Sequence, residues 1–378
     1  MATVSASAGS NVLRRWLGEM PFIAGAITTA VLFTVGSSWF DDASVLWRSA
    51  LLFVWIFAIM LWCSFGVVRH ADHLAEALGE PYGTLILTLA VITIEVALIS
   101  AIMLTGANEP TLARDTMFAV LMIVLNGMVG LVLLVGGIKH RQQEYNVAGA
   151  NAFLGVIVPL AVCALVLPSF SRSTPDLSLS TPQAVFLALV TILLYGIFLM
   201  IQTTRHRGMF VGPGSEEHHH PEHHSAGSGS IAFHAVMLVM TMLPIVLLSK
   251  KLAVFVDHGV SQLQAPAALG GLIVALVVLT PEALSALGAA RADRLQRSVN
   301  ICLGSALATI SLTVPAVLTI SLVTGNHVEL GLGQVDMVLL GLTILVSMLT
   351  FGSRRTNILQ GAVHLVLFLV YLLMIFDS

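Results

Sequence analysis

The chain has 378 residues, 57% of them hydrophobic and only 10% charged, and its mean hydropathy is +0.94. This composition excludes a water-soluble domain of that size and indicates a polytopic membrane protein. The net charge of −3 carries little information, because the positions of the charges matter more in a membrane protein. The three cysteines lie in separate apolar runs without a CxxC spacing, which argues against a disulfide framework and against a thiolate metal site.

Apolar runs follow one another along the chain. A helix needs about 20 apolar residues to cross the hydrocarbon layer, and on that basis we predict eleven transmembrane helices. The first follows Arg14 and Arg15 and lacks a clear small-residue cleavage pattern, so we expect it to be retained. The predicted spans are 21–39, 46–68, 82–105, 116–138, 148–168, 182–202, 231–249, 266–289, 298–323, 334–351 and 357–376.

Basic residues are distributed unevenly between alternate loops. Since cytoplasmic loops are enriched in Lys and Arg, we expect the N-terminus in the cytoplasm and, with an odd number of spans, the C-terminus in the periplasm. The twelve basic residues on the N-terminal side are Arg14, Arg15, Arg69, Lys139, Arg141, Arg205, Arg207, Arg291, Arg294, Arg297, Arg354 and Arg355. The five on the other side are Arg48, Arg114, Arg172, Lys250 and Lys251.

Without the first span, the chain contains five spans, a polar loop and five more spans. An odd number of spans in each half forces the halves into opposite orientations, as in the inverted repeats of secondary transporters. The predicted fold is an all-α polytopic membrane protein with one extra N-terminal helix and two inverted five-helix repeats. Its predicted parts are an N-terminal tail with the extra helix (1–45), the first repeat (46–203), a cytoplasmic linker rich in His, Gly and Ser (204–230) and the second repeat (231–378).

Each half contains a helix with a single glutamate. Glu95 lies in TIEVALISAIML (93–104) and Glu282 in TPEALSALGAA (280–290). A carboxylate in hydrocarbon is costly, so such a residue usually faces the protein interior and marks an ion or proton path. Two glutamates in matched places predict one shared binding site for cations and protons. The alternatives are that each carboxyl group only bonds a neighbouring helix, and that the two halves are alike by chance.

Neutral oxygen atoms accompany both glutamates. Pro281 removes a backbone donor, and we expect it to interrupt its helix and to free the carbonyls of residues 278–280. An all-oxygen set with two carboxylates suits a hard cation, Ca²⁺ above all, more than zinc or copper, which favour His or Cys. The candidate neutral ligands are Thr93, Asn126, Val278, Thr280, Asn300, Ser305 and Thr309.

The paired carboxylates also predict exchange with protons. Two ionised carboxylates in a low-dielectric site repel each other and are desolvated, and both effects favour protonation. A cation and protons then compete for the same oxygens, and competition with alternating access gives antiport. We therefore predict a secondary transporter that exchanges cytoplasmic Ca²⁺ for protons, with Na⁺ and K⁺ as further candidate substrates, and with neither enzymatic activity nor a cofactor.

Other functions remain open. An antiporter mainly for Na⁺ and K⁺ is the second transport hypothesis. A passive channel needs a continuous polar pore, whereas the polar residues cluster in two helix pairs, and an intramembrane hydrolase needs a catalytic set such as paired Asp or Ser/His. The expected partners are the transported ions, membrane lipid and a second copy of the chain, and no nucleic acid is expected.

The histidines fall into two groups. A tract in the linker, GPGSEEHHHPEHHSAGSGS (212–230), holds His218, His219, His220, His223 and His224. We interpret the tract as a flexible linker, with loose metal binding or pH sensing as the alternative, because imidazoles titrate near pH ~6.5. His234 and His364 are isolated within spans, where we expect hydrogen bonds in the core, with a proton relay as the alternative.

Several long strings are similar to a known family. They are VVRHADHLAEALGEPYGTLILTL (67–89), IEVALISAIMLTG, LTPEALSALGAA and GSALATISLTVPAV (304–317). In them the chain resembles the bacterial Cha-type calcium/sodium-potassium:proton antiporters, a branch of the cation/calcium exchanger superfamily. The resemblance implies inverted five-helix repeats, residence in the bacterial inner membrane, and one acidic residue per repeat as a shared cation and proton ligand. Those roles fall on Glu95 and Glu282.

The chain departs from other calcium:proton exchangers beside these glutamates. Their helices read Gly-Asn-Ala-x-Glu, whereas here Val91-Ile92-Thr93-Ile94 and Leu279-Thr280-Pro281 precede the two glutamates. The resemblance therefore does not identify the neutral ligands, and Ca²⁺, Na⁺ and K⁺ all remain candidate substrates.

Overall fold

The structure is a computed structural model that describes residues 18–34, 46–79, 81–105, 110–172, 178–213, 228–262 and 266–376. Nearly all of these residues are helical, which confirms the all-α membrane fold. The elements, in chain order, are α2 (Met20–Thr34), α4 (Leu46–Leu78), α5 (Tyr82–Thr105), α6 (Leu112–Met122), η1 (Ile123–Met128), α7 (Val129–His140), β1 (Gln143–Glu144), α8 (Val147–Ala161), η2 (Val162–Val166), η3 (Leu167–Phe170), α9 (Thr181–Met200), η4 (Ile201–Arg205), η5 (Arg207–Phe210), α10 (Ser228–Gln262), α11 (Ala267–Arg291), α12 (Leu295–Ala308), η6 (Thr309–Thr313), α13 (Val314–Thr324), α14 (Gln334–Phe351), β2 (Arg355–Thr356) and α15 (Ile358–Ile375).

The apolar helices are broadly consistent with the eleven predicted spans. Within the described ranges, nine helices are long and apolar enough to cross a membrane, and two shorter apolar segments, Met20–Thr34 and Thr84–Val96, lie where the other two spans were predicted. Phe186, Leu189 and Leu193 show why α9 suits lipid, since these side chains, three and four residues apart on one face, are 69%, 64% and 62% exposed.

Two helices continue beyond their predicted spans. α4 has 33 residues and α10 has 35, whereas the apolar runs end near residues 68 and 249. The helical hydrogen-bond pattern continues through polar residues, because Lys, His, Ala and Leu are compatible with a helix in water as well as in lipid. Apolar length therefore identified the spans but not the ends of these helices.

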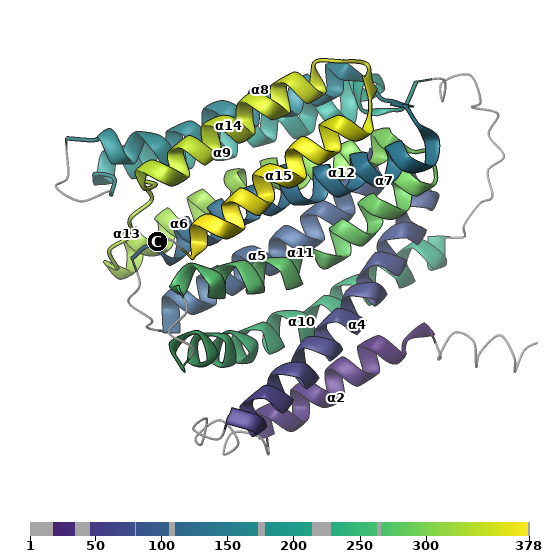
Figure 1. Ribbon diagram of the computed structural model, residues 1–378. Coiled ribbons are helices and arrows are strands. Elements are labelled where there is room, and N and C mark those ends of the chain that lie inside the picture. Colours follow the sequence, from purple (N-terminus) through teal and green to yellow (C-terminus); the bar gives the residue numbers. More distant parts are fainter. Residues whose placement is uncertain are drawn as a thin grey trace, which may run out of the picture.

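The helices are arranged in layers. α4 and α10 lie side by side and pack on α5 and α11, as Figure 1 shows. On their other side, α5 and α11 contact α12, and α11 also contacts α6 and α7. The helices α8, α9 and α14 lie farther from α4 and α10 (Figure 1). The helices that carry the two glutamates are thus enclosed on both sides by other helices.

Alternate loops lie at opposite ends of the bundle, as the distribution of basic residues predicts. At one end, β1 follows α7 and pairs antiparallel with β2, which precedes α15. Lys139 Nζ at this end donates to the carbonyl oxygen of Arg291 at 2.9 Å. At the other end, the backbone N–H of Glu329 donates to the carbonyl oxygen of Pro110 (N···O 2.9 Å).

The expected helix break at Pro281 is wrong. The helix α11 runs without interruption from Ala267 to Arg291. Proline removes only its own N–H, the usual donor to the carbonyl of Val277 four residues earlier, and packing on the neighbouring helices keeps the segment helical. The Thr280 hydroxyl donates to a carbonyl one turn earlier at 2.8 Å. The reason for choosing the carbonyls of Val278 and Thr280 as ligands is therefore lost.

Some predictions lie beyond what the structure tests. His218, His219, His220, His223 and His224 lie outside the described residues. Both interpretations of that histidine tract stay predictions, and so do the domain boundaries.

Gly361 allows α15 to approach α7 closely. A Cβ atom added there would lie 2.6 Å from the backbone nitrogen of Leu134 and 2.9 Å from the carbonyl oxygen of Gly130, so the two helices would have to separate. We expect Gly361→Ala to lower the free energy of unfolding by about 1–3 kcal/mol, measured as a lower Tm of the purified protein in detergent. Gly341→Ala is the control, because nothing lies within 4 Å of its added Cβ. Equal Tm values for the two variants would contradict this account of the α7–α15 contact.

Candidate cation site

Glu95 projects from α5 into the interior of the bundle and is only 3% exposed. Its Oε2 accepts a hydrogen bond from Thr309 Oγ1 at 2.9 Å, and its Oε1 accepts one from Thr313 Oγ1 at 3.4 Å. Both threonines belong to η6, in the second half of the chain. The carboxyl group of the first half is thus held by hydroxyl groups of the second half.

Glu282 projects from α11 and is fully buried. Its Oε2 accepts a hydrogen bond from Ser305 Oγ on α12. Its Oε1 is buried and has no hydrogen-bond partner among the described residues. Buried polar atoms without a partner are rare and costly, so this oxygen is a candidate position for a ligand.

The two carboxyl groups meet at one face of a single helical segment. Ser305 and Thr309 are four residues apart, which brings their side chains to within about 5–6 Å on one face of a helix. Each bonds a different glutamate, and the two carboxyl groups lie close enough to interact electrostatically. The structure therefore brings Glu95 and Glu282 together, although 187 positions separate them in the sequence.

A π-helical turn shapes the segment that bonds the glutamates. The helix that begins at Leu295 changes from α to π geometry at Thr309–Thr313 and returns to α geometry at Val314. Such π-turns insert an extra residue into the helical repeat and are frequent at functional sites. Here Thr309 and Thr313, at the two ends of the turn, both donate to Glu95.

The donor set consists of oxygen atoms. Two carboxyl groups and three hydroxyl groups surround the site, and the hydroxyl oxygens keep lone pairs while their protons bond the carboxyl groups. Oxygen donors of this kind suit hard cations such as Ca²⁺, Na⁺ and K⁺.

Of the predicted neutral ligands, the structure places two, Ser305 and Thr309, against the glutamates. Thr93 lies on an exposed face of α5, where its hydroxyl donates to the carbonyl of Leu89 at 2.7 Å. Val278 is a buried apolar side chain, and its carbonyl lies within the continuous helix α11.

The two asparagines bond other partners. Asn126 Nδ2 donates to Thr343 Oγ1 at 2.7 Å on α14, and its Oδ1 lies 3.3 Å from Nδ1 of His364 on α15. Asn300 Nδ2 donates to the carbonyl oxygen of Phe210 at 2.7 Å. His364 thus forms hydrogen bonds in the core, as expected from its isolated position.

Thr313 was not among the ligands predicted from the sequence. Its position does carry a signal, because residues 305, 309 and 313 recur every four residues and so lie near one face of a helix. This spacing becomes informative only once a helix is known to face the glutamates.

A cavity lies beside the site. It is small and is lined by residues of α5, α8, α9, η4 and α12. Thr84 and Thr88 line it from the part of α5 that precedes Glu95. Tyr195 belongs to its wall and lies close enough to Glu282 to interact electrostatically. Gly304, the residue before Ser305, also lines the cavity, and Gln202 lines it close to the loop that follows α9 and η4.

The fold and this donor arrangement have counterparts in known proteins. The sequence pattern of the family described as "Sodium/calcium exchanger protein" matches residues 48–204 and 233–376, one segment in each half of the chain. The chain belongs to the sodium/calcium exchanger family. The resemblance noted in the sequence is thereby confirmed.

The chain is similar in sequence or in fold to several named antiporters. The sodium-potassium/proton antiporter ChaA of Escherichia coli (strain K12) is 42% identical over 315 residues, which cover 83% of this chain and 85% of the relative. The Ca²⁺/H⁺ antiporter ChaA of Bacillus subtilis (strain 168) is 24% identical over 246 residues, which cover 64% and 69% of the two chains. The solved structure of the Ca²⁺/H⁺ antiporter protein YfkE shares the fold, with a TM-score of 0.67, 19% identity and coverage of 96% of this chain and 99% of that one.

Replacement of Thr313 by valine tests its part in this exchanger's site. The variant removes a hydroxyl group that bonds Glu95 and keeps the shape of the side chain. Since a typical hydrogen bond contributes about 0.5–1.5 kcal/mol, we expect whichever of Ca²⁺, Na⁺ and K⁺ binds the wild-type protein to bind a few-fold to about tenfold more weakly in calorimetric titration of the purified variant. Thr319→Val is the matched control, because this hydroxyl donates to the carbonyl of Pro315, outside the site. Equal affinities of both variants would remove Thr313 from the ligand set.

Proposed function

We propose that the chain is a secondary active antiporter that exchanges a cation for protons, with Glu95 and Glu282 as the shared binding groups. The supporting observation is the buried Oε1 atom of Glu282, which has no hydrogen-bond partner among the described residues while a second buried carboxyl group lies nearby. Two negative charges there would be desolvated and would repel each other. A bound cation or bound protons remove this cost.

The same oxygens bind both substrates in this mechanism. When the carboxyl groups are protonated, their charges vanish and a cation is no longer attracted. When a cation arrives, it displaces the protons and takes lone pairs from the carboxylates and from the hydroxyl groups of Ser305, Thr309 and Thr313. The empty, doubly ionised site is the unfavourable state, so the site exchanges one substrate for the other instead of standing empty. Alternation of access between the two sides of the membrane then gives antiport.

Ca²⁺ is the proposed principal substrate. A divalent cation balances two carboxylates, and Ca²⁺ accepts six to eight oxygen ligands in a flexible geometry. Na⁺ and K⁺ form the second candidate class, which the name of the 42% identical sodium-potassium/proton antiporter of Escherichia coli supports.

We further propose that the protein resides in the bacterial inner membrane with its N-terminus in the cytoplasm and its C-terminus in the periplasm. The bacterial relatives and the excess of basic residues on the N-terminal side support this orientation. The cavity beside Tyr195 then serves as the access path from the cytoplasm, with Thr84, Thr88 and Gln202 as polar groups along it.

Neutralisation of either glutamate tests the shared site. We expect Glu95→Gln and Glu282→Gln each to slow cation-driven proton movement at least about a hundredfold, equivalent to about 2.7 kcal/mol in the activation barrier, because the amide neither releases a proton nor balances a cation. Proteoliposomes with an internal pH-sensitive dye provide the measurement. Glu144→Gln is the control, because Glu144 lies in β1 and pairs with Arg355 at the surface. Full transport by either glutamine variant would refute the shared-site mechanism.

A comparison of cations tests the substrate class. Everted membrane vesicles with an imposed pH gradient receive Ca²⁺, Na⁺ or K⁺ separately. We expect Ca²⁺ to dissipate the gradient at the lowest concentration, since it alone balances both carboxylates. A response to Na⁺ or K⁺ without one to Ca²⁺ would move the protein to the second candidate class, and cation flux without opposing proton flux would identify a channel.

A further inference from the structure

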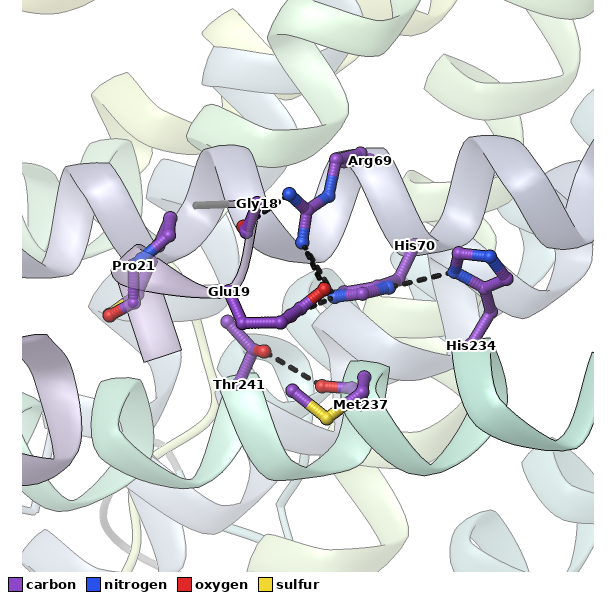
Figure 2. A network of polar contacts seen from close by, with 9 residues as sticks. Gly18, Glu19, Pro21, Arg69, His70, His234, Met237 and Thr241 are labelled. Atoms are coloured by element: carbon purple, nitrogen blue, oxygen red, sulfur yellow. Dashed lines mark hydrogen bonds and ion pairs between the residues drawn. The ribbon is translucent and has the colours of Figure 1, made fainter. Parts of the chain in front are cut away.

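A second cluster of titratable groups lies at one end of the bundle, on the same side as the start of α2. His70 on α4 is fully buried, and its Nε2 lies 3.1 Å from Oε2 of Glu19, the residue before α2. Its Nδ1 lies 3.0 Å from Nδ1 of His234 on α10. Figure 2 shows these three side chains in line, with Arg69 beside them. One chain of hydrogen bonds thus links α2, α4 and α10.

The hydrogen-bond pattern limits how many protons the cluster can hold. A neutral imidazole has one N–H donor and one acceptor nitrogen, and a protonated one has two donors. An ionised Glu19 requires a proton on Nε2 of His70, so Nδ1 of a neutral His70 must accept the proton of His234 Nδ1. One further proton fits if His70 becomes doubly protonated and His234 Nδ1 becomes the acceptor. If another proton binds after that one, both imidazoles are positively charged. Their Nδ1–H groups then face each other, with the two nitrogen atoms 3.0 Å apart.

The surrounding charges come from three elements. Glu19 precedes α2 and accepts from Arg69 Nη2 at 2.9 Å as well as facing His70. Arg69 also lies 3.1 Å from His70 Nε2. His73, one turn along α4, places its ring 4.5 Å from that of His234. The remaining charged group of this turn of α4, Asp72, instead forms an ion pair with Arg297 at the start of α12.

We propose that Glu19, His70 and His234 form a proton-binding site, separate from the Glu95–Glu282 pair, that fastens the start of α2 to α4 and α10 and releases it when both imidazoles are protonated. The proposal does not depend on which cation the protein transports. Glu19 precedes residue 48, where the family match begins, so the site belongs in part to the extra N-terminal helix. α2 packs on α4 and α10, and these two helices pack on α5 and α11, which carry the glutamates. Attachment of α2 therefore stabilises the helix layer that covers the carboxyl groups.

The accessibility of the Cys63 thiol can be used to detect release of α2. Cys63 on α4 is fully buried under α2, and its Sγ donates to the carbonyl oxygen of Pro21 at 3.2 Å. A Cβ on Gly25 of α2 would lie 2.5 Å from the same sulfur. Departure of α2 therefore uncovers Cys63. Cys163 in η2 is partly exposed. It serves as an internal reference for the general effect of pH on alkylation.

The experiment is alkylation of the full-length protein in nanodiscs with N-ethylmaleimide, followed by mass spectrometry of both cysteines. We expect the ratio of Cys63 to Cys163 labelling rates to rise about fivefold or more between about pH 7.5 and about pH 4, since burial and the neighbouring charges oppose protonation of both imidazoles until the pH is well below neutral. Local opening then exposes buried groups. An unchanged ratio in the wild-type protein overturns the proposal without recourse to any variant.

Two variants test whether the pH-dependent rise in the labelling ratio depends on His70 and His234. H234N keeps an N–H donor near the position of Nδ1 but cannot become charged, and H70Q keeps a donor toward Glu19. Both must lose the rise in the labelling ratio, and a full wild-type response in either overturns the proposal. H364N is the matched control, because His364 is also buried and bonds Thr350 and Asn126 on the far side of the bundle. It must retain the response.

Discussion

Two carboxyl groups without a basic partner among the described residues lie buried in an apolar interior, and this constraint explains how the central helices are arranged. A buried carboxyl group is costly unless it receives hydrogen bonds. Three hydroxyl groups on one side of the helix that spans α12, η6 and α13 supply those bonds. The helices α5 and α11 must therefore both approach that one helix, and the remaining helices enclose the three.

The two halves of the chain are alike in form but not in chemistry. In each half, the helix that follows the glutamate-bearing helix contains a π-helical turn. The turn is Ile123–Met128 in the first half and Thr309–Thr313 in the second. The second turn directs hydroxyl groups to Glu95. The first holds Asn126, whose amide bonds Thr343 and lies beside His364. The first turn thus connects α14 and α15 to the bundle by hydrogen bonds, while the second turn donates hydrogen bonds to the carboxyl group of Glu95.

The layer of α4, α10 and α2 forms the other boundary of the site. Its polar contacts lie at one end, where Glu19, Arg69, His70 and His234 connect three helices. Carboxyl groups lie in the centre and imidazoles at the end. On the two proposals made above, the protein binds protons as substrate at the centre and senses them at the end.

The sequence by itself determined the class of the protein, the positions of its spans, the alternation of its loops and the two glutamates, because each follows from local quantities: apolar length, the distribution of basic residues and the rarity of a carboxylate in an apolar run. Only the tertiary structure decided which neutral oxygens face those carboxylates. Ser305 and Thr309 lie beside them, Thr93 faces away, Asn126 and Asn300 bond other partners, and Thr313 emerged only from the packed helices. It also decided that Pro281 leaves α11 continuous and that His70 and His234, 164 positions apart, share a hydrogen bond. The reason is physical: the direction in which a side chain points, and the group it meets, depend on how helices distant in sequence are rotated and packed against one another.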